Sequence, residues 1–355
     1  MITPAKQINR FFLLATGPLL GLLIAMLISG AAIEWNSVRD KLTPEAEILQ
    51  TTASISKGLE QAKANAKTTL SSIRQTAELY RKTTTTMSSI VHTATTAAGR
   101  PESIYNRRIT SRLGTAYETI QSDRIRIELY KINPGNYRGY AMKIRLKSPD
   151  AMKMTLGKDK LGGAETTKQA VQRYGAVAGI NAGGFADSRG KRYPLSTTVL
   201  NGQYLNGFEP TYKDLFFVGL GKSGKLIGGK FQRKADLDRL QPQFGASFVP
   251  ILLQNGQRTA IPPKWQSSPL RAPRTVIGNY KDDQLLVLVV DGDDENGRSG
   301  ATLAELQNKL WKMGVQDAYN LDGGGSSSLV VNGRVVNDPS DGALRPVPTH
   351  FLFFR

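Results

Sequence analysis

Hydrophobic and polar positions alternate with the period of a β-strand over much of the C-terminal two-thirds of the chain. The alternation is clearest at 125–129 and 142–146, which predicts two half-buried strands. Shorter apolar runs bounded by Gly, Pro, Asn or Asp predict further strands at 176–180, 197–200, 215–220, 249–253, 274–278, 285–290, 328–331 and 350–354.

Helical spacing is convincing at one place in this region, residues 302–313. Thr302 is a predicted N-cap with Glu305 at the third helical position, apolar side chains share one face, and Gly314 ends the pattern. A shorter helix is predicted at 166–174. Many strands with few helices predict that residues 101–355 form an α+β domain with a mixed or antiparallel sheet.

The N-terminus has a different pattern, because residues 11–33 form a run of 23 residues without a charge. As a helix this run spans about 34 Å, enough to cross a bilayer core of about 30 Å. Lys6 and Arg10 precede it, which favours a single-pass orientation with the C-terminal domain outside the cytoplasm. A cleaved signal peptide is the alternative, but the length favours an uncleaved membrane anchor at 1–33.

Residues 34–100 are rich in Ser, Thr and Ala. Thr43 is a predicted N-cap, whereas Gly99 and Pro101 predict the end of a helix. Between them runs a narrow apolar stripe at three- and four-residue spacing: Ile55, Leu59, Ala62, Ala66, Ile73, Ala77 and Tyr80. The stripe predicts a weakly helical stalk able to self-associate, and a mostly disordered spacer is the alternative.

Composition narrows the chemistry of this 355-residue chain. It has no Cys and two His, which excludes disulfides, thiolate metal sites, Cys nucleophiles and a three-His zinc site. No G-x-S-x-G elbow occurs either. The chemistry therefore rests on carboxylates, hydroxyls, amides, Lys, Arg or backbone groups. No cofactor is evident, and the acidic groups near Asp291 leave room for a divalent cation without requiring one.

Charge points to an anionic partner. The chain carries +18, and residues 101–355 hold 36 Lys and Arg against 23 Asp and Glu, a net charge of +13. Nucleic acid is disfavoured as the partner, because the chain has no recognised nucleic-acid motif and the domain is predicted outside the cytoplasm. Acidic envelope polymers or a membrane surface fit the charge better.

Candidate catalytic groups follow two of the predicted strands. The apolar run 285–290 ends in Asp291, and 319–321 ends in Asp322. A carboxylate just past a buried strand is held by a rigid element at the rim of a sheet. After Asp322 come Gly323, Gly324, Gly325, Ser326 and Ser327, a loop whose backbone can approach a ligand closely and direct N–H groups at an anion.

Two further elements complete the set. Asn181 begins a Gly-rich turn that runs to Asp187, and Arg274 with Thr275 begins the strand at 274–278. A guanidinium in that position offers a bidentate fork for a phosphate or carboxylate.

These four elements, with the downstream segment 330–342, resemble the phosphodiester glycosidase family over about residues 170–355. The family includes many bacterial envelope proteins of exopolysaccharide biosynthesis. The resemblance implies a hydrolase that cleaves the bond between the anomeric carbon of a sugar and a phosphodiester. It also implies that Asn181, Arg274, Thr275, Asp291, Asp322 and the 323–327 loop lie in the pocket. The segment 189–193 is unusually basic for the family.

The hypothesis is that Asp322 and Asp291 act on the sugar, one as acid/base and the other as nucleophile or water-activating base. Arg274 and the 323–327 loop are expected to hold the phosphate, and Asn181 to orient a sugar hydroxyl or the phosphate. The substrate is then a phosphate-containing glycan of the cell envelope. The alternative is a non-catalytic envelope module that binds acidic or phosphate-rich glycans.

Overall fold

The computed structural model describes residues 16–17, 20, 45–292 and 300–355. The predicted anchor at 11–33 lies almost entirely outside these residues, as does the predicted cap Thr43. Among the residues described, no helix is both long enough and apolar enough to span a membrane. The chain divides into two compact units, 1–90 and 91–355.

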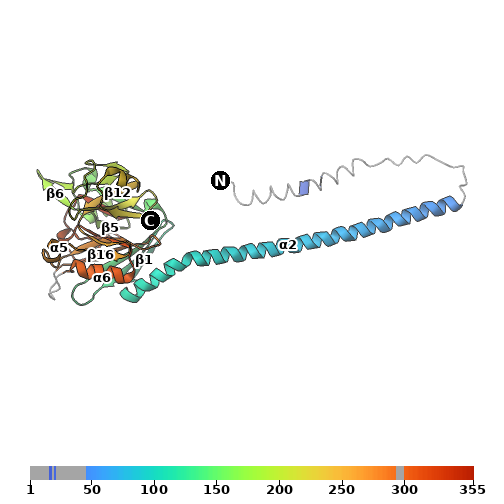
Figure 1. Ribbon diagram of the computed structural model, residues 1–355, viewed down its shortest axis with the longest axis horizontal. Coiled ribbons are helices and arrows are strands. Elements are labelled where there is room, and N and C mark those ends of the chain that lie inside the picture. Colours follow the sequence, from blue (N-terminus) through green and yellow to red (C-terminus); the bar gives the residue numbers. More distant parts are fainter. Residues whose placement is uncertain (1–15, 18–19, 21–44, 293–299) are drawn as a thin grey trace. The chain divides into compact units, whose positions relative to one another are not determined.

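The stalk region is helical, in one helix, α2 (Glu45–Leu113), of 69 residues. Figure 1 draws it as a continuous coil. The stop expected at Gly99 and Pro101 is wrong: the helix ends 12 residues later, where Gly114 has φ +82° and its N–H bonds to Thr110. The physical reason is tertiary, because Ile109 in the last turns is fully buried in a core cluster of the second unit.

The second unit is built on three antiparallel sheets and a hairpin. The eight-stranded sheet has the order β1-β2-β3-β16-β15-β17-β13-β14. Its strands are β1 (Glu118–Gln121), β2 (Ile125–Ile132), β3 (Gly139–Leu146), β13 (Ile251–Gln254), β14 (Gln257–Arg258), β15 (Arg274–Asn279), β16 (Leu285–Val290) and β17 (Asp317–Leu321).

Two five-stranded sheets face it. One has the order β11-β10-β12-β8-β9, and the other β19-β18-β5-β20-β4. Their strands are β4 (Met152–Leu156), β5 (Ala178–Asn181), β8 (Val199–Leu200), β9 (Gln203–Tyr204), β10 (Phe216–Gly221), β11 (Leu226–Gly229), β12 (Pro242–Phe248), β18 (Leu329–Val331), β19 (Arg334–Val335) and β20 (Thr349–Phe353). The hairpin is β6 (Phe185–Ser188) with β7 (Lys191–Pro194).

The helices that follow α2 in this unit are short and cover outer faces. They are α3 (Thr167–Tyr174), α4 (Lys234–Asp238), α5 (Pro263–Ser267) and α6 (Leu303–Met313). Three 3-10 turns are also present, η1 (Pro149–Ala151), η2 (Gly157–Asp159) and η3 (Gly324–Ser326). Both predicted helices are present. Thr166 and Thr302 each form a capping box, and Gly314 ends α6 in the left-handed region. The α+β class with antiparallel sheets is therefore confirmed.

The main core lies between the eight-stranded sheet and the other two, and it includes Leu129, Met142, Phe216, Val287 and Phe351. A second cluster lies on the other face of the large sheet, where α6 and the end of α2 pack. Strand β16 is buried at every residue, as its unbroken apolar run predicts. Strands β4 and β12 were not predicted, because Lys153 and Gly245 interrupt their hydrophobic pattern.

Candidate active site

The site forms at one edge of the large sheet, where β15 begins and its two neighbours end. Arg274 pairs with Val290 of β16, and Thr275 pairs with Leu321 of β17. The turns that follow these neighbours, at Asp291 and Asp322, therefore flank the start of β15. Their strands lie two positions apart in the sheet, about 10 Å between backbones. The structure thus places both predicted carboxylates and Arg274 at one edge.

Asp322 has the chemically distinctive environment. Its Oδ1 accepts a hydrogen bond from the N–H of Gly323 (3.1 Å), and within the described structure its buried Oδ2 has no hydrogen-bond partner. Burial raises the pKa of this carboxyl to about 6, and Ser326, the Gly323 N–H, Arg345 and Arg192 oppose the rise. An unpartnered buried carboxylate oxygen with a raised pKa is a typical feature of a functional acid or base.

The loop after Asp322 is held against β15. The N–H of Gly324 donates to the carbonyl of Pro273 (2.9 Å), and Gly324 has φ +59°, which favours glycine. Gly325 has no room for a side chain, since an added Cβ would overlap the carboxylate of Asp341 and the guanidinium of Arg345. The Oγ of Ser327 is buried and lacks a hydrogen-bond partner among the described residues, whereas the Ser326 hydroxyl lies close enough to the Asp322 carboxyl to lower its pKa. This loop therefore supplies polar groups beside Asp322.

Two arginines lower the pKa of Asp322, Arg345 and Arg192, and neither is among the predicted site residues. Arg345 donates to the Asp341 carboxylate over Gly325 (2.7 and 3.1 Å). Arg192, on β7, pairs with Asp187 (3.1 Å), donates to the carbonyl of Pro346 and stacks 4.7 Å from the Phe185 ring centroid. In the sequence, Arg192 could have been noticed because it lies in the basic segment 189–193. Arg345 follows by three residues the end of the segment 330–342 that resembles the family.

Asn181 bonds to the residues on both sides of the 323–327 loop. It is fully buried, and its Nδ2 donates to the carbonyl of Asp322 (2.6 Å). Its Oδ1 accepts from Thr275 Oγ1 (2.8 Å) and the N–H of Ser328 (3.0 Å). Three of the four hydrogen bonds that a carboxamide can make thus go to protein groups. Asn181 and the equally buried Thr275 therefore hold the turn at Asp322, and their contact with a substrate stays a prediction.

The residues of this site lie in a part of the chain that is similar to a known protein family. Residues 174–354, just over half of the chain, match the family model of the phosphodiester glycosidases. This chain belongs to the phosphodiester glycosidase family. The match contains Asn181, Arg192, Asp322 and Arg345, so the whole arrangement around Asp322 lies in the family domain.

Curated relatives include N-acetylglucosamine-1-phosphodiester alpha-N-acetylglucosaminidase from two mammals. The mouse enzyme is 28% identical over 200 residues, which cover 51% of this chain and 37% of the enzyme. The human enzyme is 43% identical over 137 residues, or 35% of this chain and 26% of the enzyme. The chain thus spans little more than a third of the length of the mouse enzyme and about a quarter of that of the human enzyme.

A solved structure shows the same fold. The zebrafish enzyme of that name, described as a catalytic domain auto-inhibited by its pro-peptide, aligns with a TM-score of 0.52 at 19% identity. The alignment covers 68% of this chain and 86% of that one.

Two other predicted site residues of this phosphodiester glycosidase domain have protein partners. Arg274 is buried and donates to the carbonyls of Pro269 (3.0 Å) and Ala301 (3.5 Å), and burial lowers its pKa to about 10. Its guanidinium bonds to those two loops, and its Cδ lies 3.9 Å from where a Cβ on Gly323 would stand. Arg274 thus packs beside the loop after Asp322, and its contact with a phosphate stays a prediction.

Asp291 is buried and bonded at both oxygens. Its Oδ1 accepts from the N–H of Asp338 (2.8 Å), and its Oδ2 lies 3.4 Å from Arg138 Nε. Arg138 also pairs with the Asp338 carboxylate (2.8 Å). Burial raises the pKa of Asp291 to about 6, against the opposing effect of these contacts. Its observed contacts tie the segment beginning at Asp338, which carries Asp341, to the end of β16.

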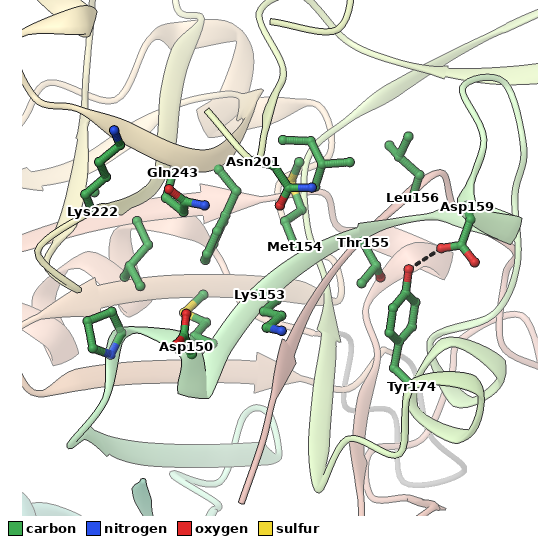
Figure 2. Close-up of a pocket in the computed structure, with 16 residues that line it drawn as sticks. Asp150, Lys153, Met154, Thr155, Leu156, Asp159, Tyr174, Asn201, Lys222 and Gln243 are labelled. Carbon is green, nitrogen blue, oxygen red and sulfur yellow. Dashed lines mark hydrogen bonds between the residues drawn. The ribbon is translucent and has the colours of Figure 1, made fainter. Parts of the chain in front are cut away.

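No group of three or more His, Cys, Asp or Glu that could hold a metal ion occurs within the described ranges. The acidic residues Asp293 and Glu295, which follow Asp291 in the sequence, lie outside those ranges. A cavity of about 540 Å³ elsewhere is shown in Figure 2, with Thr155, Asn201 and Lys222 among its lining residues. Tyr174 donates to Asp159 at its rim, and none of the predicted site residues lines it.

Proposed function

We propose that this chain hydrolyses the bond between the anomeric carbon of a sugar and a phosphodiester. The observation that carries the proposal is the Asp322 carboxyl, whose Oδ2 has no partner among the described residues, at the start of a Gly-Ser loop that Arg345 contacts at Gly325. The charges of Arg345 and Arg192 lower the pKa of this carboxyl. Family membership supports the reaction class, and the relatives named above are phosphodiester glycosidases by name.

The chemistry follows from the leaving group. The oxygen of water bonds to the anomeric carbon. The bond between that carbon and the oxygen that bridges to phosphorus breaks, and a phosphomonoester leaves with the bridging oxygen. A phosphodiester needs little protonation to leave, so the main demand is stabilisation of its negative charge. Arg345, Arg192, the loop N–H groups and the Ser326 and Ser327 hydroxyls supply that stabilisation.

Asp322 acts on the sugar side in its deprotonated form. It is either the nucleophile or the base that activates water, and the stereochemistry of the released sugar decides between the two. Asp291 becomes a positioning residue in this proposal, because its Oδ1 bonds to the N–H of Asp338 and its Oδ2 pairs with Arg138, which also pairs with the Asp338 carboxylate. Asn181 and Thr275 position the backbone of Asp322 in the same way.

The test is incubation of the full chain with aryl phosphodiesters of α-linked N-acetylglucosamine and of other sugars, with and without EDTA. Release of free sugar is expected, and Asp322→Asn should lower kcat by about 10³-fold while thermal stability is kept. Asp150→Asn, an exposed carboxylate with the same charge change, is the control. Salt-sensitive glycan binding without sugar release, unaffected by Asp322→Asn, would support the non-catalytic glycan-binding alternative instead.

The cellular setting is also a proposal. The uncharged run at 11–33, preceded by Lys6 and Arg10, supports a single-pass anchor that holds the domain outside the cytoplasm, on envelope or exopolysaccharide glycans. In sealed cells, protease added outside should remove the domain and leave the anchor in the membrane. Protection of the domain from the protease would contradict this orientation.

Self-association through α2 is proposed on its exposed side chains. Leu59, Ala66, Ile73, Tyr80 and Met87 follow one another at intervals of seven, and the four large ones are 60–74% exposed. This is the spacing of the a positions of a coiled coil, although Thr occupies several neighbouring positions that are apolar in a strong coiled coil. Ile73→Gln together with Met87→Gln should shift the full chain toward monomer in sedimentation equilibrium. An unchanged distribution would exclude α2 as the contact.

A further inference from the structure

A second cavity, about 450 Å³ in volume, lies beside the candidate active site. It is lined by Lys158, Lys160, Leu161, Gly162, Gly163, Ala164, Gly190, Lys191, Arg192 and Pro346. Ligand sites in proteins are commonly of about 300–1,000 Å³, so the space suits a small group or one unit of a polymer.

All the charged residues that line this cavity, here called the lysine pocket, are basic. Four of its ten residues are Lys or Arg and none is Asp or Glu. Within the described parts of the chain, no carboxylate pairs with Lys158, Lys160 or Lys191, although many other basic side chains of the domain have acidic partners. The Lys158 charge acts on the buried Glu165 carboxylate, but Glu165 already pairs with Arg173, so the three lysines leave a net positive charge that attracts an anion.

The backbone around the lysine pocket is held in place from two sides. The N–H of Arg192 bonds to the carbonyl of Gly162 (3.3 Å), which fixes the β6–β7 hairpin against the segment that follows β4. Gly157 bonds to the carbonyl of Pro348 (2.9 Å), and the N–H of Lys158 donates to the buried carboxylate of Glu165 (3.2 Å). The lysines therefore extend from a fixed frame.

The lysine pocket and the candidate active site have Arg192 in common. Arg192 lines the pocket and also acts on the Asp322 carboxyl. Its guanidinium donates to the carbonyl of Pro346, another lining residue, and Pro346 directly follows Arg345. An extended substrate with its scissile phosphate at Arg192 and Arg345 can therefore reach the lysines with its next anionic group.

Building on the proposed function, we infer that the lysine pocket is a subsite for a second phosphate of the same substrate. The substrate class is then a polyanionic chain in which phosphates repeat, and the scissile sugar-1-phosphodiester is one of them. Lysine suits this role because ammonium groups bind a phosphate as point charges, without the fixed orientation that an arginine fork imposes.

The experiment compares two substrates and two triple variants of the full chain. One substrate is an aryl sugar-1-phosphodiester, and the other carries the same sugar-1-phosphodiester joined through glycerol to a second phosphate. The pocket variant is Lys158→Gln, Lys160→Gln and Lys191→Gln. The control variant is Lys222→Gln, Lys281→Gln and Lys312→Gln. These lysines are exposed and do not line the pocket, and their replacement removes the same charge.

The pocket variant should lose about 10-fold in kcat/KM on the two-phosphate substrate, the size expected for three solvent-accessible charge contacts. It should change less than twofold on the aryl substrate, and the control variant should match the unmodified chain on both. An equal loss on both substrates, or no loss on either, overturns the subsite.

A binding measurement separates this inference from the proposed function. Inorganic tripolyphosphate titrated calorimetrically into the full chain at low salt should bind the unmodified chain and the control variant, and bind the pocket variant about 10-fold more weakly. If no substrate releases sugar but this difference holds, the hydrolase proposal fails and the anion site stands. Equal binding by both variants removes the site. Binding of orthophosphate as tight as that of tripolyphosphate would identify a free-phosphate site and overturn the polymer subsite.

Discussion

Asn181 and Asp322 come from different sheets, and the Asn181 side chain donates a 2.6 Å hydrogen bond to the main-chain carbonyl of Asp322. The N–H of Asp322 in turn bonds to the carbonyl of Ala182 (3.1 Å). Two hydrogen bonds thus join the end of β5 to the turn after β17. The position of the candidate catalytic carboxylate depends on this connection between sheets.

Asn181→Ala should therefore harm both stability and turnover. It leaves the Ser328 N–H and the Asp322 carbonyl without partners, at a cost of about 1–3 kcal/mol in the free energy of unfolding. Because the Asp322 turn moves, kcat should fall by about 100-fold. Denaturant unfolding and steady-state kinetics measure the two effects. Asn279→Ala, at the other end of β15, is the control: it should lose stability and keep kcat. Normal kcat in Asn181→Ala would show that the bond does not position Asp322.

Activity and stability should depend on pH in opposite directions near pH 6. The pKa of Asp322 is raised from 3.8 to about 6, so between these values the folded protein holds a proton that the unfolded chain has lost. Stability therefore falls as pH rises from about 4 to about 6. Activity rises over the upper part of that range, because the deprotonated carboxylate is the reactive form.

The stability effect can be assigned by substitution. Asp322→Asn should show a smaller loss of stability between pH 4.5 and pH 7 than the unmodified chain, measured by denaturant unfolding at both values. Part of the loss should remain, because the pKa of Asp291 is raised to about 6 as well. An identical pH dependence in Asp322→Asn would mean that Asp322 ionises at its ordinary pKa.

Gly325→Ala tests the packing of the loop. The added methyl group would overlap the carboxylate of Asp341 and the guanidinium of Arg345, so the ion pair must move. We expect a loss of about 1–3 kcal/mol in unfolding free energy and a larger KM for the phosphodiester. Gly58→Ala adds the same methyl in open space on α2 and should leave KM unchanged. A normal KM in Gly325→Ala would remove Arg345 from substrate binding.

Arg345→Ala should lower kcat/KM by about 10²-fold, the loss typical for removing one donor that stabilises a developing anion. Arg345→Lys should recover part of it, because the charge returns without the bidentate fork. Arg239→Ala, an exposed ion-paired arginine on another element, is the control. If Arg274→Ala abolishes turnover while Arg345→Ala does not, the phosphate site lies at Arg274, where the sequence placed it.

The sequence determined the elements whose signals are local. The unbroken apolar run of β16 predicts a strand buried on both faces, and the capping pattern of Thr302 with Glu305 predicts where α6 begins. The motif at Asp322 also lies within one stretch of chain, so the catalytic candidate and its loop could be identified from the residues alone.

Tertiary structure decided which groups surround that motif. Arg192 and Arg345 lie 153 residues apart along the chain, and the β6–β7 hairpin and the segment after Asp338 bring both near Asp322. The hydrogen bond of Asn181 to the Asp322 turn and the continuation of α2 to Leu113 have the same origin, contacts with residues distant in the sequence. Local pattern determines secondary structure, whereas long-range contacts determine which polar groups have partners and which are left for a substrate.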